Sequence, residues 1–197
     1  MKSTIQKSLE NSLTYSDYKT KITELFQKGL VTGNDQNEKL LHYTELNEAR
    51  VRRLDKTLQL TAEVKASLEN LNNEQIWLVI SEGWCGDSAQ LIPIFNKMAE
   101  VSDRIELRIV LRDENDDLMN QFLTNGTRSI PLLILLDKET LTVIGKFGPR
   151  PQEARQLILD YKSEHGHVDE TAKTNLHKWY TEDKGISTQN EIMALLQ

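Results

Sequence analysis

Apolar residues in the first third of the chain recur every three or four positions, which is the spacing of one face of an α-helix. The first stripe begins at Tyr15, and Thr14 with Asp17 three positions later resembles a helix-capping pair. Two further helical patterns follow before residue 71. All three patterns are amphipathic, so we expect residues 1–70 to form a helical extension that packs on the core of the protein.

The pattern changes after residue 75, where short apolar runs begin to alternate with helix-like segments. A nearly continuous apolar run indicates a strand buried on both faces, whereas alternating apolar and polar residues indicate a half-buried strand. The predicted strands cover 76–81, 105–113, 131–137 and 142–147, and the predicted helices cover 86–101, 115–126 and 151–162. The predicted order is therefore β-α-β-α-β-β-α, with Asn115 as the expected cap of the second of these helices.

The connections between these elements predict the topology. Helical crossovers imply parallel neighbouring strands, whereas the short polar turn around Lys138 implies an antiparallel hairpin. We therefore expect an α/β fold, with a mixed sheet covered by helices on both faces. This domain is assigned to residues 71–163, followed by a C-terminal tail over 164–197 in which TNLHKWY and NEIMALLQ predict two short helices.

Composition and charge narrow the class of protein. Hydrophobic residues make up 38% and charged residues 27%, which is typical of a soluble globular protein, and the net charge of −6 disfavours nucleic acid or anionic membranes as partners. The longest apolar stretch, around 130–136, is too short to span a bilayer, and the N-terminal residues lack the apolar core of a signal peptide. A single cysteine excludes an internal disulfide. Together these features predict a cytoplasmic protein.

The one cysteine, Cys85, lies in the stretch SEGWCGDSAQLIP, between a predicted strand and a predicted helix. A thiol at a helix N-terminus faces free backbone N–H groups and the positive end of the helix dipole, which favour the thiolate. The Asp87 carboxylate opposes this effect, and the Ser88 hydroxyl, one turn along, can donate a hydrogen bond to the thiolate. We therefore predict a moderately lowered pKa for Cys85. The alternative is that Cys85 is a small, buried apolar side chain with no catalytic role.

Three features of the sequence, at matching spacings from one another, resemble the thioredoxin superfamily. Trp84-Cys85-Gly86 follows a buried strand and opens a helix, Pro93 lies eight residues after the cysteine, and Ile130-Pro131 precedes the third strand. The resemblance covers roughly residues 71–162. More narrowly, EGWCGDSAQ with a helical N-terminal extension is similar to a group of bacterial thioredoxin-like proteins.

The resemblance implies a thioredoxin-like fold and a set of site residues. It places a cis-proline, Pro131, beside Cys85, and leaves the backbone of Ile130 free to pair with an extended substrate. Trp84 would flank the thiol, and Gly86 and Asp87 would contact the substrate. Without the resemblance, the local sequence favours a simpler interpretation, in which Pro131 is a proline at the start of a strand and Trp84 is a side chain that fills the core.

The chain departs from dithiol thioredoxins at two positions. Ser88 replaces the second cysteine, which in those proteins attacks the mixed disulfide, and Val79 replaces a buried acid that transfers protons. Monothiol glutaredoxins share the C-x-x-S pattern, and some bind an iron–sulfur cluster, but the surrounding segment is similar to thioredoxin instead. We expect no metal and no cofactor, and His42, His165, His167 and His177 lack metal-ligand spacing with Cys85.

These observations lead to one main hypothesis and two alternatives. The main hypothesis is a monothiol oxidoreductase in which Cys85 attacks a protein or small-molecule disulfide, Ser88 stabilises the thiolate, and glutathione or another external thiol resolves the mixed disulfide. A non-catalytic binding or scaffold protein and a thiol redox sensor remain open. We interpret Arg50, Arg52 and Arg53 as solvated or ion-paired surface residues, whereas Arg128 fits either a surface role or an anion pocket.

Overall fold

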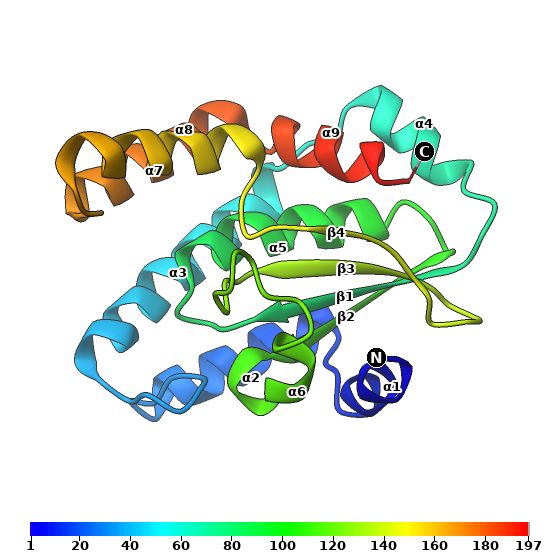
Figure 1. Ribbon diagram of the computed structural model, residues 1–197, viewed down its shortest axis with the longest axis horizontal. Coiled ribbons are helices and arrows are strands. Elements are labelled where there is room, and N and C mark those ends of the chain that lie inside the picture. Colours follow the sequence, from blue (N-terminus) through cyan, green and yellow to red (C-terminus); the bar gives the residue numbers. More distant parts are fainter. Residues whose placement is uncertain (197) are drawn as a thin grey trace.

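The computed structural model describes residues 1–196, and a four-stranded mixed sheet lies at its centre (Figure 1). The strands follow the order β2-β1-β3-β4 across the sheet. Their bounds are β1 (Gln75–Ser81), β2 (Ile105–Leu111), β3 (Leu132–Asp137) and β4 (Val143–Phe147). β1 pairs in parallel with β2 and antiparallel with β3, and β3 and β4 form an antiparallel hairpin. The predicted fold class, the parallel crossover from β1 to β2 and the antiparallel β3–β4 hairpin are confirmed. The parallel crossover expected between β2 and β3 is wrong, because β3 pairs antiparallel with β1 and therefore runs antiparallel to β2.

The alternation of side chains along β1 divides the core into two halves. Trp77 and Val79 face helix α5 (Gly86–Ala99), whereas Ile76, Leu78 and Ile80 face the opposite side. All five side chains are buried, as expected for a central strand covered on both faces.

The opposite side of the sheet is covered by α1 (Lys2–Glu10) and α6 (Asp116–Met119), as Figure 1 shows. Helix α1 was not predicted from the sequence. The predicted helix over 115–126 is wrong in length, because only its first turn is helical. Asn115, which follows the short 3₁₀ turn η1 (Arg112–Glu114), does not cap α6 with its side chain. Its side-chain Nδ2 instead donates to the Leu111 carbonyl.

The remaining N-terminal helices agree with the sequence pattern. They are α2 (Tyr15–Gln27), α3 (Glu38–Thr57) and α4 (Ala62–Glu69). The Thr14 hydroxyl caps α2 by accepting a hydrogen bond from the Asp17 amide. Buried residues of α2 and α4, including Tyr18, Val64 and Leu68, join the same core half as α5. Helices α3 and α4 pack against α5, whereas α2 packs against α3 and β2.

The C-terminal part consists of α7 (Gln152–His165), α8 (Glu170–Asp183) and α9 (Ile186–Ala194). In Figure 1, α7 and α8 lie side by side, and α9 lies between α4 and α5. Leu176 and Tyr180 of α8 and Ile192 of α9 enter the core half of α5. Within residues 1–196, no helix is both long and apolar enough to cross a membrane.

Candidate functional site

The thiol of Cys85 lies at the junction between β1 and α5. Cys85 is the N-cap residue of α5, and its amide donates to the Glu82 carbonyl, which closes the turn after the strand. Its Sγ donates to the carbonyl oxygen of Ile130 at 3.4 Å, and the Ile130–Pro131 peptide bond is cis. The two segments named by the sequence, 84–88 and 130–131, are therefore adjacent.

The Cys85 side chain is only 9% exposed and packs in the apolar core half that contains Ile130 and Leu118. Burial and, as a smaller cause, the negative charge of Asp87 raise the pKa of the thiol to about 11. The hydroxyl of Ser88 and the first backbone N–H groups of α5 favour the thiolate but do not offset these two effects. The expectation of a lowered pKa was wrong, because desolvation outweighs the helix N-terminus.

Ser88 lies one turn along α5 from Cys85 and is 2% exposed. Its hydroxyl lies near enough to Sγ to favour the thiolate form. However, no group among the described residues makes a hydrogen bond of regular geometry with Ser88 Oγ. The hydroxyl is therefore a buried polar group with spare hydrogen-bonding capacity.

Asp87 is buried and is held by two residues from distant parts of the chain. The guanidinium of Arg150 contacts both carboxylate oxygens, with Nε at 3.0 Å and Nη2 at 2.6 Å, and the Tyr180 hydroxyl donates to Oδ1 at 2.8 Å. Burial disfavours the charged form of Arg150, but its pairing with Asp87 leaves the pKa above the ordinary value. Asp87 thus fixes α8 and the loop after β4 to the first turn of α5.

Gly86, between Cys85 and Asp87, faces α8 and α3. A Cβ at this position would lie 3.3 Å from Cε1 of His177 and 3.8 Å from Nη1 of Arg50. Burial and the nearby positive charges of Arg50 and Arg150 lower the pKa of His177 to about 4, so the imidazole is neutral at pH 7. The backbone at the start of α5 is therefore closely approached by side chains of the two helical extensions.

Trp84 is half-buried beside the thiol segment. Its indole Nε1 donates to the Thr32 carbonyl at 3.0 Å, and the Arg112 guanidinium lies 5.0 Å from the ring centroid. The loop between α2 and α3, which contains Thr32, thus fixes the indole next to Cys85. Trp84 is oriented by these contacts and is not simply core filling.

Glu82 is a buried carboxyl group that sequence reasoning missed. The residue is fully buried, its Oε1 accepts from the Asp113 amide at 3.0 Å, and its Oε2 has no hydrogen-bond partner among residues 1–196. Burial raises the pKa of Glu82. Val79, in contrast, is fully buried in the apolar core, as its sequence position implied.

A family model described as Thioredoxin matches residues 33–172, which is more than half of the chain. The chain belongs to the thioredoxin family. A solved structure of a Pseudomonas aeruginosa protein of unknown function matches this thioredoxin-family chain with a TM-score of 0.59 and 20% identity, covering 93% of this chain and 97% of that one. An HIV epitope-scaffold structure matches with a TM-score of 0.54 and 21% identity, covering 93% and 98%. At these identities the two structures show the fold alone. A comparison with curated proteins finds no match.

In this thioredoxin-family chain, all seven residues singled out from the sequence lie at one place, around the start of α5. They are Cys85, Ser88, Trp84, Gly86, Asp87, Ile130 and Pro131. Three residues at this place were missed: Glu82, Arg150 and Tyr180. An acid directly after a buried strand was a weak signal for Glu82, whereas only the fold brings Tyr180 to Asp87.

The arginines singled out from the sequence of this thioredoxin-family chain differ in their surroundings. Arg52 pairs with Glu48 and Arg128 pairs with Asp116, so both form surface ion pairs. Arg50 departs from this expectation, because it is half-buried, donates to the Asn47 side chain and approaches Gly86. Within residues 1–196, no group of three or more potential metal ligands is present.

Proposed function

We propose that this thioredoxin-family protein exchanges thiols and disulfides through Cys85 alone. The observation that carries the proposal is the position of Sγ at the N-terminus of α5, 3.4 Å from the carbonyl of Ile130. In the proposed complex, an extended disulfide substrate pairs with the backbone at Ile130 and presents a sulfur to Cys85. Trp84 and the first turn of α5 form the rest of the contact surface.

The proposed reaction has three exchange steps. The Cys85 thiolate attacks one sulfur of a substrate disulfide, which forms a mixed disulfide with Cys85 and releases the other sulfur as a thiolate that takes up a proton. A first external thiol, such as glutathione, then attacks Sγ of Cys85 as its thiolate, which releases the second substrate sulfur as a thiolate and leaves the external thiol bound to Cys85. A second external thiol attacks the outer sulfur of this adduct, which frees the Cys85 thiolate and forms the disulfide of the two external thiols. The electron pair that reduces the substrate comes from two external thiols, so no second cysteine in the chain is required.

The raised pKa of Cys85 determines the rates of these steps. At pH 7 a thiol with a pKa of about 11 is almost fully protonated, so the first attack is slow. A thiol of high pKa is also a poor leaving group. An external thiol therefore preferentially attacks Sγ of Cys85 and expels the sulfur bound to it, instead of expelling Cys85. We therefore infer slow formation and long persistence of the mixed disulfide. A reducing cytoplasm rich in small thiols suits this cycle.

The decisive experiment incubates the reduced protein with glutathione disulfide and follows its intact mass. The proposal expects a slow gain of one glutathione on wild-type protein, no gain on Cys85→Ser, and release on addition of dithiothreitol. Ser88→Cys should additionally reduce insulin, because it restores a resolving thiol next to Cys85. The proposal would be refuted if folded wild-type protein formed no glutathione adduct and folded Ser88→Cys protein did not reduce insulin.

A second candidate function is a binding protein without redox turnover. The observation that favours it is the burial of the Cys85 thiol together with its raised pKa. The same mass experiment separates the candidates, because a binding protein leaves Cys85 unmodified. A redox sensor would form the adduct but would not catalyse repeated disulfide reduction with excess glutathione.

A further inference from the structure

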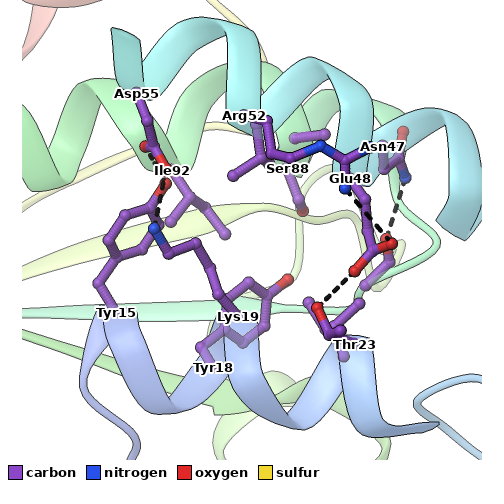
Figure 2. A pocket seen from close by; sticks show the side chains of 14 residues that line it. Tyr15, Tyr18, Lys19, Thr23, Asn47, Glu48, Arg52, Asp55, Ser88 and Ile92 are labelled. Atoms are coloured by element: carbon purple, nitrogen blue, oxygen red, sulfur yellow. Dashed lines mark hydrogen bonds and ion pairs between the residues drawn. The ribbon is translucent and has the colours of Figure 1, made fainter. Parts of the chain in front are cut away.

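A pocket of about 240 Å³ lies between α2, α3 and α5. Figure 2 shows the side chains of α2 and α3 facing each other across it. Among the described residues, Cys85, Trp84 and Pro131 do not line the pocket, but Ser88, one turn along α5 from Cys85, does, so the pocket adjoins the thiol site without containing the thiol. Its lining consists of Tyr15, Tyr18, Lys19, Ile22, Thr23, Asn47, Glu48, Val51, Arg52, Asp55, Gly83, Ser88, Ala89 and Ile92.

The inner walls of the pocket are mainly apolar. Ile22 comes from α2, Val51 from α3, and Ala89 and Ile92 from α5, and the ring of Tyr18 adds an aromatic surface. An occupant with an apolar body would therefore be removed from water on several sides.

The charged side chains of the lining form two ion pairs, one between α2 and α3 and one along α3. Lys19 of α2 pairs with Asp55 of α3 at 2.8 Å, and Arg52 pairs with Glu48 at 3.7 Å. The hydroxyl of Thr23 also donates to Glu48 (Figure 2). Because each of these four charges already faces an opposite charge, the pocket favours an uncharged occupant over an ion.

The buried hydroxyl of Ser88 is the polar group available to an occupant. It reaches into the pocket from α5, opposite Tyr18 (Figure 2), and makes no regular hydrogen bond within residues 1–196. The other buried polar groups of the lining are already engaged: Tyr18 Oη with Ser81 at 2.9 Å, and Asn47 Nδ2 with the Gly83 carbonyl at 3.0 Å. An unpartnered hydroxyl in an apolar pocket is stabilised by a ligand that completes its hydrogen bonds.

We propose that this pocket binds a small, uncharged and mainly apolar molecule that carries one hydrogen-bonding group directed at Ser88. A cavity of about 150 Å³ holds benzene, so this larger pocket has room for one ring with a short substituent. A single-ring phenol has the required chemistry, with an apolar body and one hydroxyl. This assignment stands whether or not Cys85 exchanges disulfides.

The test titrates the ¹⁵N-labelled full-length protein with 4-ethylphenol and follows the backbone amides by NMR. The expected result is saturable shifts concentrated in α2, α3 and the first two turns of α5. Val51→Phe, which fills the pocket from the half-exposed side of α3, should abolish them. Leu159→Phe, on the exposed surface of α7, is the matched control and should bind like wild type.

The role of Ser88 is tested with ethylbenzene, which has nearly the same shape but no hydroxyl. Wild type should bind 4-ethylphenol more tightly than ethylbenzene by roughly 5-fold, which is the value of one ordinary hydrogen bond. Ser88→Ala should remove most of this difference while it still binds ethylbenzene. The proposal is overturned by non-saturable shifts, by shifts located elsewhere, or by unchanged binding in a folded Val51→Phe protein; equal affinities for the two probes would overturn the assigned role of Ser88.

Discussion

The reactivity of Cys85 provides a direct test of the site. With a pKa of about 11, the thiol is ionised at pH 8 in roughly one molecule in 1,000, whereas a free thiol with a pKa of about 8.5 is ionised in roughly one in four. This difference slows alkylation by roughly 200-fold. A thiolate of higher pKa is intrinsically more nucleophilic, which raises the rate by roughly 10-fold. Cys85 should therefore be alkylated about 20-fold more slowly than a free thiol.

The perturbation is Asp87→Asn, which removes the negative charge that helps to raise the pKa of Cys85. The variant also leaves the positive charge of Arg150 unopposed next to the thiol. Both changes favour the thiolate, so we expect the pKa to fall by on the order of one unit. It should remain above that of a free thiol, because burial is the larger cause of the shift.

The assay is the rate of alkylation by iodoacetamide between pH 7 and pH 12, fitted for its midpoint. Since Cys85 is the only cysteine, every modified molecule reports this site. Asp103→Asn, an exposed carboxylate beyond the far end of α5, is the matched control and should leave the midpoint unchanged. A wild-type midpoint below about 9, or an unchanged midpoint in Asp87→Asn, would refute the assignment of burial and Asp87 as the causes.

Three further predictions concern stability, measured by urea unfolding at a series of pH values. The pKa of His177 is about 4 in the folded protein against 6.5 as its ordinary value, so the unfolded chain binds a proton between these pH values that the folded protein does not. Stability therefore falls as the pH drops from 6.5 toward 4. The full shift corresponds to about 3 kcal/mol; solvent screening at the half-buried imidazole reduces the expected loss to about 2 kcal/mol, and His177→Gln should remove it. Burial raises the pKa of Glu82 above its ordinary value of 4.5, so folding favours the protonated carboxyl group. The stability that this carboxyl group contributes is lost as the pH rises through its folded-state pKa, and Glu82→Gln should become more stable than wild type toward pH 8. Arg150→Met leaves the buried Asp87 unpaired and should cost about 3 kcal/mol at pH 7.

Each of these predictions has a contrary outcome. Parallel pH profiles for wild type and His177→Gln would contradict the assigned burial of the imidazole. A Glu82→Gln protein whose advantage does not grow with pH would contradict a raised pKa. A loss below about 0.5 kcal/mol in Arg150→Met would place that pair among ordinary surface contacts.

The sheet and the approximate position of the site could be predicted from the sequence because both depend on local patterns. Trp77 and Val79 alternate with Ile76 and Leu78, which specifies two buried faces, and the spacing from Cys85 to Pro131 indicates the neighbouring loop. The short length of α6 could not be predicted, because the apolar residues after Met119 enter the core from a non-helical segment.

The chemistry of the site was less predictable than its location. The pKa of Cys85 depends on how completely the thiol is desolvated, and that depends on the packing of Ile130 and Leu118 from distant segments. Likewise, the pairing of Asp87 with Arg150 and Tyr180 joins residues 63 and 93 positions apart. No local pattern encodes contacts at such separations.

The contacts of Asp87 also affect how any large partner would bind next to Cys85. A partner that docks over the first turn of α5 competes with α8 and with the loop after β4, which Tyr180 and Arg150 hold against this turn. If release of these contacts costs about 3 kcal/mol, only roughly one molecule in 150 is receptive at a given moment. The apparent dissociation constant of the partner is then raised by the same factor. For such a partner, the C-terminal helices would be an intramolecular competitor whose strength sets the concentration needed to bind next to Cys85.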